Sequence, residues 1–259
     1  MTTPRMQESA ILPPHPAIPG LDYFSGSLLA GGTNCDYFDC FELNGRNLGL
    51  ALADVRGQGP AASRLTASLR GMLRALHTTR GSSLKTMVRT VDRLFAQVAP
   101  DHCYATLFFA EYDPASGRLR YVNAGHEPPF VLRRNGTHTQ TLFLEPGGPM
   151  IGMLRESAYR EGVVALHPGD LLIAYTDGLC ETANPAGEEW GWPRFLEAIE
   201  QADRRRARDM VDEVMSAATA FAAGTPPRDD ATLFIGRVRD TQTVSPRWEV
   251  EWLAAPTAA

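Results

Sequence analysis

The chain has 259 residues, of which 44% are hydrophobic and 21% are charged, and its formal net charge is −5. This composition is that of a globular protein with a substantial core, and the negative charge argues against nucleic acid or an anionic membrane surface as a partner. The sequence shows neither a secretory signal nor the roughly 18 uninterrupted apolar residues of a membrane span. The four scattered cysteines indicate neither a disulfide framework nor a zinc site, so we expect a cytoplasmic protein.

The first part of the chain is predicted to run from an extended lead-in to a hairpin and then to a helix pair. Residues 1–20 are rich in proline and form the lead-in. Two apolar stretches at 36–43 and 47–55 flank an Asn-Gly turn, which predicts a pair of strands. Apolar residues then recur with a helical period, which predicts amphipathic helices at about 60–77 and 83–98.

The second part of the chain returns to strands before a further pair of helices. Strand-like runs lie at 103–112, 118–123, 128–133, 159–166 and 171–176. Helices are predicted at about 192–201 and 206–222, followed by a strand at 231–238. The tail alternates apolar and polar residues at 247–252, which predicts one more strand that either completes a sheet edge or pairs with a partner chain.

The order of these elements predicts the fold class. Several strands are joined by hairpin-length turns, and the helices come in consecutive pairs instead of alternating with strands. Both features argue against a doubly wound parallel sheet. We expect an α+β fold, a four-layer αββα sandwich of two mainly antiparallel sheets flanked by helix pairs. The expected domain covers 21–239, between the lead-in at 1–20 and a C-terminal extension at 240–259.

Acidic residues occur where strands end or turns begin. They are Asp36 with Asp39, Asp54, Asp177, and Asp229 with Asp230. Carboxylates at the mouth of a hydrophobic sheet are costly unless they are paired or bound to a cation. We expect these carboxylates to converge without matching Lys or Arg, an arrangement that suits hard divalent cations. Any one Asp before Gly is more often a turn former, so the information lies in the ordered set.

Five short motifs occur in order along the chain. They are Asp36-Tyr37-Phe38-Asp39, Ala53-Asp54-Val55-x-Gly57-x-Gly59, Asn123-Ala124-Gly125-His126, Tyr175-Thr176-Asp177-Gly178 and Asp229-Asp230-Ala231-Thr232. Together they resemble the PPM family of metal-dependent protein serine/threonine phosphatases, in its bacterial SpoIIE-like (RsbU-like) branch. The resemblance extends from about residue 11 to 238, and the fold that it implies agrees with the expected sandwich.

The resemblance implies a centre of two Mn²⁺ or Mg²⁺ ions. Asp54 would bridge both ions, and the backbone carbonyl of Val55 would be a further ligand. Asp36, Asp177 and Asp229 would complete the protein ligands. The ions would lower the pKa of a bound water, and the resulting hydroxide would attack phosphorus directly. The four aspartates are therefore the expected catalytic residues, acting through this metal-activated water.

The resemblance also implies a substrate class, which is phosphoserine or phosphothreonine on a regulatory phosphoprotein. A STAS-type anti-anti-sigma factor is the expected partner, and association as a homodimer is left open. One departure favours an alternative function, because Asn34-Cys35 replaces the Gly-Gly that is usual in this branch. The alternative is a catalytically weak or inactive module that binds a phosphoprotein. A haloacid-dehalogenase-type phosphatase is disfavoured, because Asp36-x-x-Asp39 has the wrong spacing for its nucleophile.

Several residues keep two interpretations at this stage. Asp39 and Asp230 either bind metal or support the site from outside. His126 is either a general acid or a hydrogen-bonded structural residue. A group of arginines forms either a solvated helix face or a dock for an acidic phosphoprotein, namely Arg204, Arg205, Arg206 and Arg208. The resemblance also implicates the helix pair at 60–77 and 83–98 in switching the enzyme on.

Overall fold

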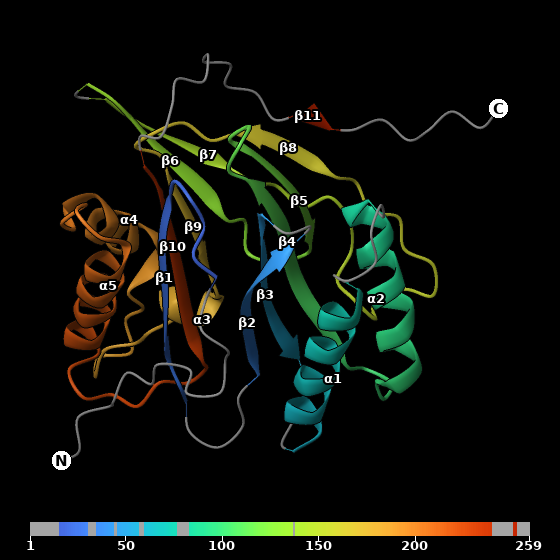
Figure 1. The fold of residues 1–259 in the computed structure, drawn as a ribbon. Helices are drawn as coiled ribbons and strands as arrows, with labels where there is room; N and C mark the ends of the chain where they lie inside the picture. Colours follow the sequence, from blue (N-terminus) through green and yellow to red (C-terminus); the bar gives the residue numbers. More distant parts are fainter. Residues whose placement is uncertain are drawn as a thin grey trace.

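The computed structural model describes residues 16–30, 35–43, 46–56, 60–76, 83–136 and 138–239, together with the backbone of 251–252. Within these residues the strands form a five-stranded and a six-stranded sheet. Every neighbouring pair of strands is antiparallel. The two sheets lie face to face with helices outside each of them (Figure 1). The predicted four-layer α+β sandwich is thus confirmed.

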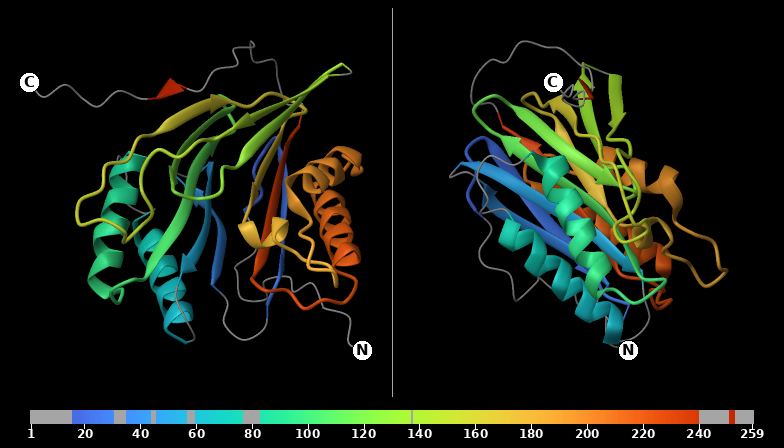
Figure 2. Two further views of the ribbon diagram at one scale, coloured as in Figure 1. Left: turned by 180° about the vertical axis from the view of Figure 1, so that it is seen from behind. Right: turned by 90° about the vertical axis from the view of Figure 1, so that its right-hand side faces the viewer.

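The five-stranded sheet has the order β1-β10-β9-β6-β7. Its strands are β1 (Leu21–Leu28), β10 (Ala231–Val238), β9 (Leu171–Tyr175), β6 (Phe130–Asn135) and β7 (His138–Phe143). The helices α4 (Gly191–Gln201) and α5 (Ala207–Ala222) cover its outer face, and Figure 2 shows the same arrangement from behind. A single helical turn, α3 (Asp177–Cys180), follows β9 directly.

The six-stranded sheet has the order β11-β8-β5-β4-β3-β2. Its strands are β11 (Glu251–Trp252), β8 (Gly162–Ala165), β5 (Arg118–Ala124), β4 (Tyr104–Asp113), β3 (Asn47–Arg56) and β2 (Asp36–Leu43). Its outer face is covered by α1 (Pro60–Leu76) and α2 (Leu84–Val98), which lie side by side (Figure 1). Both helices end within one residue of the bounds that their apolar periodicity predicts.

Three apolar clusters fill the three spaces between the four layers. The strand β3 shows how the sequence builds two of them at once. Ala53 and Val55 pack toward the helix pair, whereas Leu50 and Leu52 pack toward the other sheet. Successive side chains of a strand point to opposite faces. Asp54 therefore shares the face of Leu50 and Leu52, and β3 directs its carboxylate into the seam between the sheets.

Three elements of the structure were not predicted. β1 pairs with β10 along its whole length, but its sequence LDYFSGSL does not alternate cleanly between apolar and polar residues. β7 pairs with β6 although its side chains are mostly exposed or half-buried, so it carries little apolar signal. α3 has only four residues, fewer than a periodicity argument needs. The strand expected at 159–166 is also shorter, at Gly162–Ala165.

Both ends of the chain and some internal turns lie wholly or partly outside the described residues. Most of the lead-in at 1–20, the turn residues Asn44 and Gly45, and the segment 57–59 lie outside the described residues. Of the tail strand predicted at 247–252, residues 251–252 pair with β8 and complete the sheet edge, and residues 247–250 lie outside the description. No helix in the described part of the chain combines the length and the apolar character that crossing a membrane requires.

Candidate metal centre

Four separate segments bring four carboxylates to one end of the seam between the sheets. Asp36 begins β2, and Asp54 lies near the end of β3, where the two residues are register partners. Asp177 follows β9 and Asp229 lies just before β10. Because β9 and β10 are antiparallel neighbours, the end of one lies beside the start of the other. The structure thus brings together the four aspartates that the sequence analysis singles out as metal ligands.

Arg56 places its guanidinium among three of these carboxylates. Its Nε lies 3.0 Å from Oδ2 of Asp54, and its terminal nitrogens lie 2.7 Å from Oδ2 of Asp177 and 3.6 Å from Oδ2 of Asp229. The side chain of Arg56 is 44% exposed, so the guanidinium also meets solvent. The expectation that no Lys or Arg matches the acidic sites is therefore wrong.

Even with this guanidinium, the carboxylate cluster keeps an excess of negative charge. With Arg56 in this position, no three His, Cys, Asp or Glu side chains of the described residues are arranged to hold an ion together. However, one positive charge faces three carboxylates directly, and Asp36 lies close enough to act on Asp54. An oxygen-rich cluster with surplus negative charge has the donor chemistry that Mg²⁺ and Mn²⁺ prefer.

Asp36 is held by two threonines of the opposite sheet. Thr176 and Thr232 donate their hydroxyl groups to its Oδ2, at 2.8 and 2.7 Å. Burial raises the pKa of Asp36 well above its usual range, and the charges of Asp54 and Asp230 raise it further, against the lowering effect of the two hydroxyl groups. The carboxylate therefore stands in a fixed position, and burial and the neighbouring carboxylates destabilise its charged form.

The charged form of the Asp54 carboxyl group is also destabilised. Burial is the largest cause that raises its pKa to about 6, and the charges of Asp177 and Asp229 add to it, whereas Arg56 lowers it. The backbone N–H of Asp54 donates to the hydroxyl of Thr106 at 3.2 Å, which fixes the strand at this point. Burial and mutual repulsion thus outweigh the single arginine, and a divalent cation would relieve both.

The carboxylates of Asp177 and Asp229 are each anchored by the next residue. The N–H of Gly178 donates to Asp177, and the N–H of Asp230 donates to Asp229. Gly178 also permits a close approach of the two segments, because a Cβ at this position would lie 2.1 Å from the carbonyl oxygen of Asp230. The glycine of the Tyr-Thr-Asp-Gly motif is therefore required for packing next to the site.

Asp230 binds the backbone that leads into β2. Its two carboxylate oxygens accept the N–H groups of Ala30 at 2.9 Å and Cys35 at 2.8 Å, so it joins the two ends of the segment 31–34. The carbonyl of Cys35 accepts the N–H of Val55 at 3.1 Å. This geometry favours support over ligation for Asp230. These hydrogen bonds also fix the backbone of Cys35. Asn34 lies outside the described residues.

Asp39 lies apart from the four carboxylates. It is three residues after Asp36 and therefore on the opposite face of β2. It is only 1% exposed, and both of its oxygens accept from the guanidinium of Arg74 on α1 at 2.6 Å. The hydroxyl of Tyr37 donates to it at 2.9 Å. Asp39 thus fastens α1 to the sheet and does not face the candidate site.

His126 connects the two sheets behind the cluster. Its Nε2 lies 3.1 Å from the carbonyl oxygen of Tyr175, so this nitrogen carries the proton and donates. Its Nδ1 then accepts from the hydroxyl of Thr106 at 2.8 Å, and that oxygen in turn accepts the N–H of Asp54. His126 is 3% exposed, and burial lowers its pKa to about 4. The geometry favours the structural interpretation over the general acid.

Sequence reasoning missed four residues of the site, namely Arg56, Thr106, Thr176 and Thr232. Two of the threonines stand inside the motifs, next to Asp177 and two residues after Asp230, so their positions could have suggested a role. Thr106 belongs to a buried strand, where threonine is common. Arg56 occupies a variable position of its motif, and nothing in the sequence tells which way a strand-end arginine turns.

Comparison with known proteins adds a family and several relatives. A model of the family described as stage II sporulation protein E (SpoIIE) matches residues 44–239. Protein IcfG of Synechocystis sp. is 28% identical over 227 residues, which cover 76% of this chain and 35% of IcfG. Phosphoserine phosphatase RsbU of Bacillus subtilis is 26% identical over 197 residues, which cover 75% of this chain and 56% of RsbU. The chain thus matches about a third to just over half of the length of these relatives.

Solved structures share the fold. The RsbU and RsbW domains of a Mycobacterium tuberculosis protein give a TM-score of 0.69 at 26% identity, covering 86% of this chain and 63% of that one. A structure of the PP2C phosphatase domain of SpoIIE from Bacillus subtilis, with a fragment of its regulatory domain, gives 0.71 at 20% identity, with coverages of 86% and 64%. The catalytic domain of the serine threonine protein phosphatase PstP, in complex with two manganese ions, gives 0.60 at 17% identity, with coverages of 85% and 100%.

Proposed function

This chain belongs to the SpoIIE family, and we propose that it is a metal-dependent protein serine/threonine phosphatase. One observation carries the proposal. Four aspartates that are far apart in the sequence meet at one end of the seam between the sheets, in the order of the phosphatase motifs. Three of them lie around a single guanidinium, which is the kind of position that a cation occupies. The likeness of the fold to PP2C-type phosphatases supports the same activity.

The residues present fit a pair of Mn²⁺ or Mg²⁺ ions. Asp36, Asp54, Asp177 and Asp229 would hold the ions through carboxylate oxygens, together with the backbone carbonyl of Val55. Bound ions would supply a hydroxide at neutral pH and neutralise the charge of the phosphate. The raised pKa values of Asp36 and Asp54 support the fit, because burial and neighbouring carboxylates destabilise their charged forms and bound cations would offset both effects. The manganese complex of PstP, which has a similar fold, supports metal dependence.

The chain's own residues organise the reaction around this cluster. Thr176 and Thr232 orient Asp36, and Asp230 holds the backbone on either side of the segment 31–34. Arg56 has to leave the carboxylates when cations take its place. Because its side chain is half-exposed, the guanidinium can turn toward solvent, where its flat fork of donors is suited to an incoming phosphate.

The substrate we propose is phosphoserine or phosphothreonine on a regulatory protein, and a STAS-type anti-anti-sigma factor is the specific candidate. The name of RsbU, a phosphoserine phosphatase, supports the phosphorylated residue. The Mycobacterium tuberculosis structure joins RsbU and RsbW domains, and this supports a place in regulatory signalling. The matched relatives are longer than this chain, so the partner belongs to the proposal.

A second candidate function is a phosphoprotein-binding module with little or no turnover. The observation that favours it is the position of Arg56, which neutralises part of the cluster without any metal. The two functions make different demands on Asp54 and Asp177. Hydrolysis requires both carboxylates as metal ligands, whereas binding of a phosphate to Arg56 would become easier without them.

The test is release of phosphate from a phosphoserine protein by the purified chain with Mn²⁺ or Mg²⁺. We expect turnover that stops when a chelator is added, and loss of turnover in Asp54→Asn and Asp177→Asn. Asp203→Asn is the matched control, because this aspartate pairs with Arg205 at an exposed position away from the cluster. Binding of the phosphoprotein without release of phosphate, unchanged or tighter in the two variants, would favour the module and contradict the phosphatase.

A further inference from the structure

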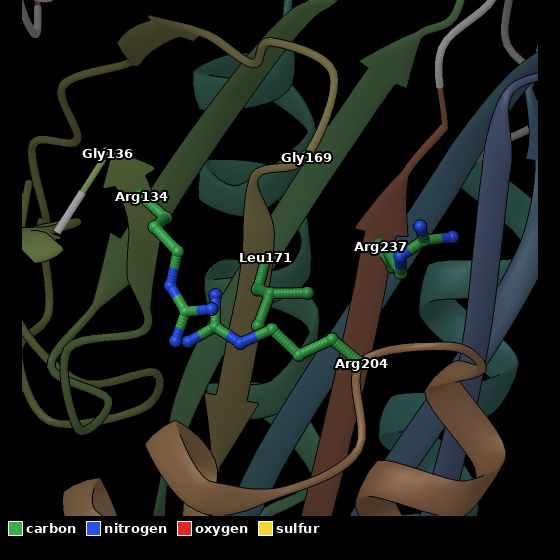
Figure 3. Close-up of a pocket in the computed structure, with 6 residues that line it drawn as sticks. All are labelled: Arg134, Gly136, Gly169, Leu171, Arg204 and Arg237. Atoms are coloured by element: carbon green, nitrogen blue, oxygen red, sulfur yellow. The ribbon is translucent and has the colours of Figure 1, made fainter.

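Four arginines near the start of α5 have different environments. The sequence predicts instead that they form either one solvated face or one docking surface. Arg205 pairs with Asp203, and the guanidinium of Arg208 lies 4.4 Å from the ring centre of Phe24. Arg206 precedes the first residue of α5. Arg204 turns instead toward the five-stranded sheet and lines a pocket (Figure 3). This arginine therefore has a different environment from its neighbours in the sequence.

The pocket has a volume of about 350 Å³ and is rich in arginine. It is lined by Arg134, Gly136, Gly169, Leu171, Arg204 and Arg237. Figure 3 shows the guanidinium groups of Arg134 and Arg204 next to each other, with Leu171 to one side of them and Arg237 beyond Leu171. Added Cβ atoms at Gly136 and Gly169 would meet nothing within 4 Å, so neither glycine is tightly packed.

The pocket is distinct from the candidate metal centre. Leu171 is the first residue of β9 and Tyr175 is the last, just before Asp177. At about 3.3 Å per residue, the two ends of this strand are about 13 Å apart. Arg237 likewise lies near the end of β10, whereas Asp229 precedes its start. The arginines and the carboxylates thus lie at opposite ends of the same strands.

Two arginines of the pocket, Arg134 and Arg204, lie close together with little compensation of their charge. Among the described residues, Nε and one terminal nitrogen of Arg204 are buried and have no hydrogen-bond partner. Burial lowers the pKa of Arg204, and the nearby charge of Arg134 lowers it further, while Glu200 acts in the opposite direction. Two guanidinium groups therefore stand together, although neither desolvation nor mutual repulsion favours this arrangement.

The acidic residues around the pocket are engaged elsewhere. Asp170 accepts from the guanidinium of Arg133 with both of its oxygens. Asp203 pairs with Arg205, and Asp22 accepts from Arg239 and from the N–H of Ala207. In the described part of the chain, no ion pair joins any of these acids to an arginine of the pocket. Glu200 acts on Arg204 through its charge, but no ion pair among the described residues joins these two side chains, so the pocket has room for an anion from outside.

We propose that this pocket binds a phosphate group, at a site separate from the metal centre. Guanidinium groups present flat forks of N–H donors that match the oxygens of phosphate in pairs. Two adjacent arginines with a third nearby call for more charge than a single carboxylate carries, and a phosphate monoester has a charge of about −1.5 to −2 near neutral pH. The unpartnered nitrogens of Arg204 are the donors that the phosphate oxygens satisfy.

The test is binding of inorganic phosphate to the metal-free full chain, measured by calorimetry in chloride buffer of matched ionic strength. Metal is removed with EDTA, and the EDTA is then dialysed away because it is itself an anion. We expect saturable binding that falls about tenfold or more in Arg204→Gln and in Arg134→Gln. Arg205→Gln is the matched control, because its side chain carries the same charge on the next residue but pairs with Asp203. Its affinity for phosphate should equal that of the wild type.

Thermal unfolding gives a second readout that does not depend on calorimetry. In chloride, Arg204→Gln should be at least as stable as the wild type, because the repulsion from Arg134 is relieved. Phosphate should raise the melting temperature of the wild type and of Arg205→Gln but not of Arg204→Gln. Absence of phosphate binding by the wild type, or equal binding by all variants, would overturn the proposal. The measurement contains no metal and reports binding alone, so this result is independent of the proposed phosphatase activity.

A comparison of ligands identifies where the phosphate comes from. A phosphoserine peptide and inorganic phosphate are titrated against the same protein, with the matching glutamate peptide as the control for charge. Tighter binding of the phosphoserine peptide assigns the pocket to a phosphorylated protein chain, and equal affinities assign it to free phosphate. Equal binding of the glutamate peptide would contradict a site for phosphate and indicate one for carboxylate.

Discussion

Arg56 is the residue whose position most affects the proposed chemistry. Its guanidinium contacts three carboxylates that are proposed to bind metal, so metal and arginine compete for the same oxygens. We expect Arg56→Gln to bind Mn²⁺ about tenfold more tightly, because removing one positive charge at contact distance favours a cation by more than 1 kcal/mol even at a partly exposed site. Calorimetry on the metal-free protein measures this directly.

Arg64→Gln is the control for Arg56→Gln. It removes the same charge from an exposed position on α1, and its affinity for Mn²⁺ should stay within twofold of the wild type. If Arg56→Gln bound Mn²⁺ no more tightly than this control, the proposed competition would be wrong. The effect on turnover can differ in sign, because the same arginine is proposed to meet the substrate phosphate.

His126 predicts a pH dependence of stability. Its pKa is about 4 in the folded protein, and an unfolded histidine titrates near 6.5. Between these values the unfolded chain binds a proton that the folded protein does not, so this group's contribution is complete above about pH 6.5 and is lost as the pH falls to about 4. The shift corresponds to a loss of up to roughly 3 kcal/mol of unfolding free energy.

The comparison variant for this prediction is His126→Gln. A glutamine side chain can donate to Tyr175 and accept from Thr106 but does not titrate. Buried aspartates with raised pKa values act in the opposite direction, and they act equally in both proteins. Urea unfolding of the metal-free proteins at several pH values should therefore show the wild type losing stability relative to His126→Gln as the pH falls. Parallel curves would refute the buried neutral imidazole.

At the scale of elements, an ion pair between Arg74 and the buried carboxylate of Asp39 helps to hold α1 on the six-stranded sheet. Arg74 and Asp39 make two hydrogen bonds of 2.6 Å, and Asp39 is 1% exposed. Removing one partner of such a pair leaves the other charge buried and unpaired. We expect Arg74→Gln to lower the free energy of unfolding by about 3 kcal/mol, measured with urea. Arg93→Gln, at an exposed position on α2, should change it by less than about 0.5 kcal/mol.

This ion pair also bears on the proposed control of activity by the helix pair. Asp54 lies on β3, and the chain passes from there through 57–59 into α1. A shift of α1 would therefore reach the proposed metal ligands, and a displacement of about 1 Å can cost roughly a hundredfold in rate. If Arg74→Gln weakens Mn²⁺ binding while the chain stays folded, α1 is coupled to the metal centre. Unchanged metal titrations would leave α1 with a structural role only.

At the scale of the whole molecule, the two sheets meet in polar contacts at the proposed metal centre. Asp36 of one sheet accepts from Thr176 and Thr232 of the other, and Asp230 accepts from Cys35. Ions bound between Asp54 and the aspartates near β9 and β10 would add further links across the same seam. A ligand that binds only the folded state stabilises it by about 2.7 kcal/mol at a concentration of 100 times Kd.

The parts of this fold that follow from sequence are those with a strong local pattern. β10 was predicted at 231–238, where it is found, because its sequence ATLFIGRV is a short, largely apolar run with β-branched and aromatic residues. α2 places Leu84, Val88 and Val91 on one buried face, which is a clear helical period. β1 could not be predicted, since its pairing with β10 depends on a partner about two hundred residues away.

In the candidate site too, features with a local sequence pattern could be predicted and features that depend on distant contacts could not. The four aspartates could be named because the motifs order them, and each lies at a strand end. The direction of Arg56 and the hydroxyl groups around Asp36 could not be predicted, because they depend on how two sheets meet in space. Asp39 shows that belonging to a motif does not place a residue in the site. The motif includes Asp39, but the alternation of side chains along β2 points it away from the cluster.

The most direct measurement of the central claim is the number of Mn²⁺ ions bound per chain, obtained by calorimetry on metal-free wild-type protein and on Asp54→Asn. Asp54 lies among the carboxylates that are proposed to hold the ions, so loss of its charge should weaken metal binding. We predict two ions per wild-type chain, with phosphate released from phosphoserine only when they are bound, and loss of at least one ion together with turnover in Asp54→Asn. Two ions bound with wild-type affinity by Asp54→Asn, or wild-type turnover after complete removal of metal, would contradict the account.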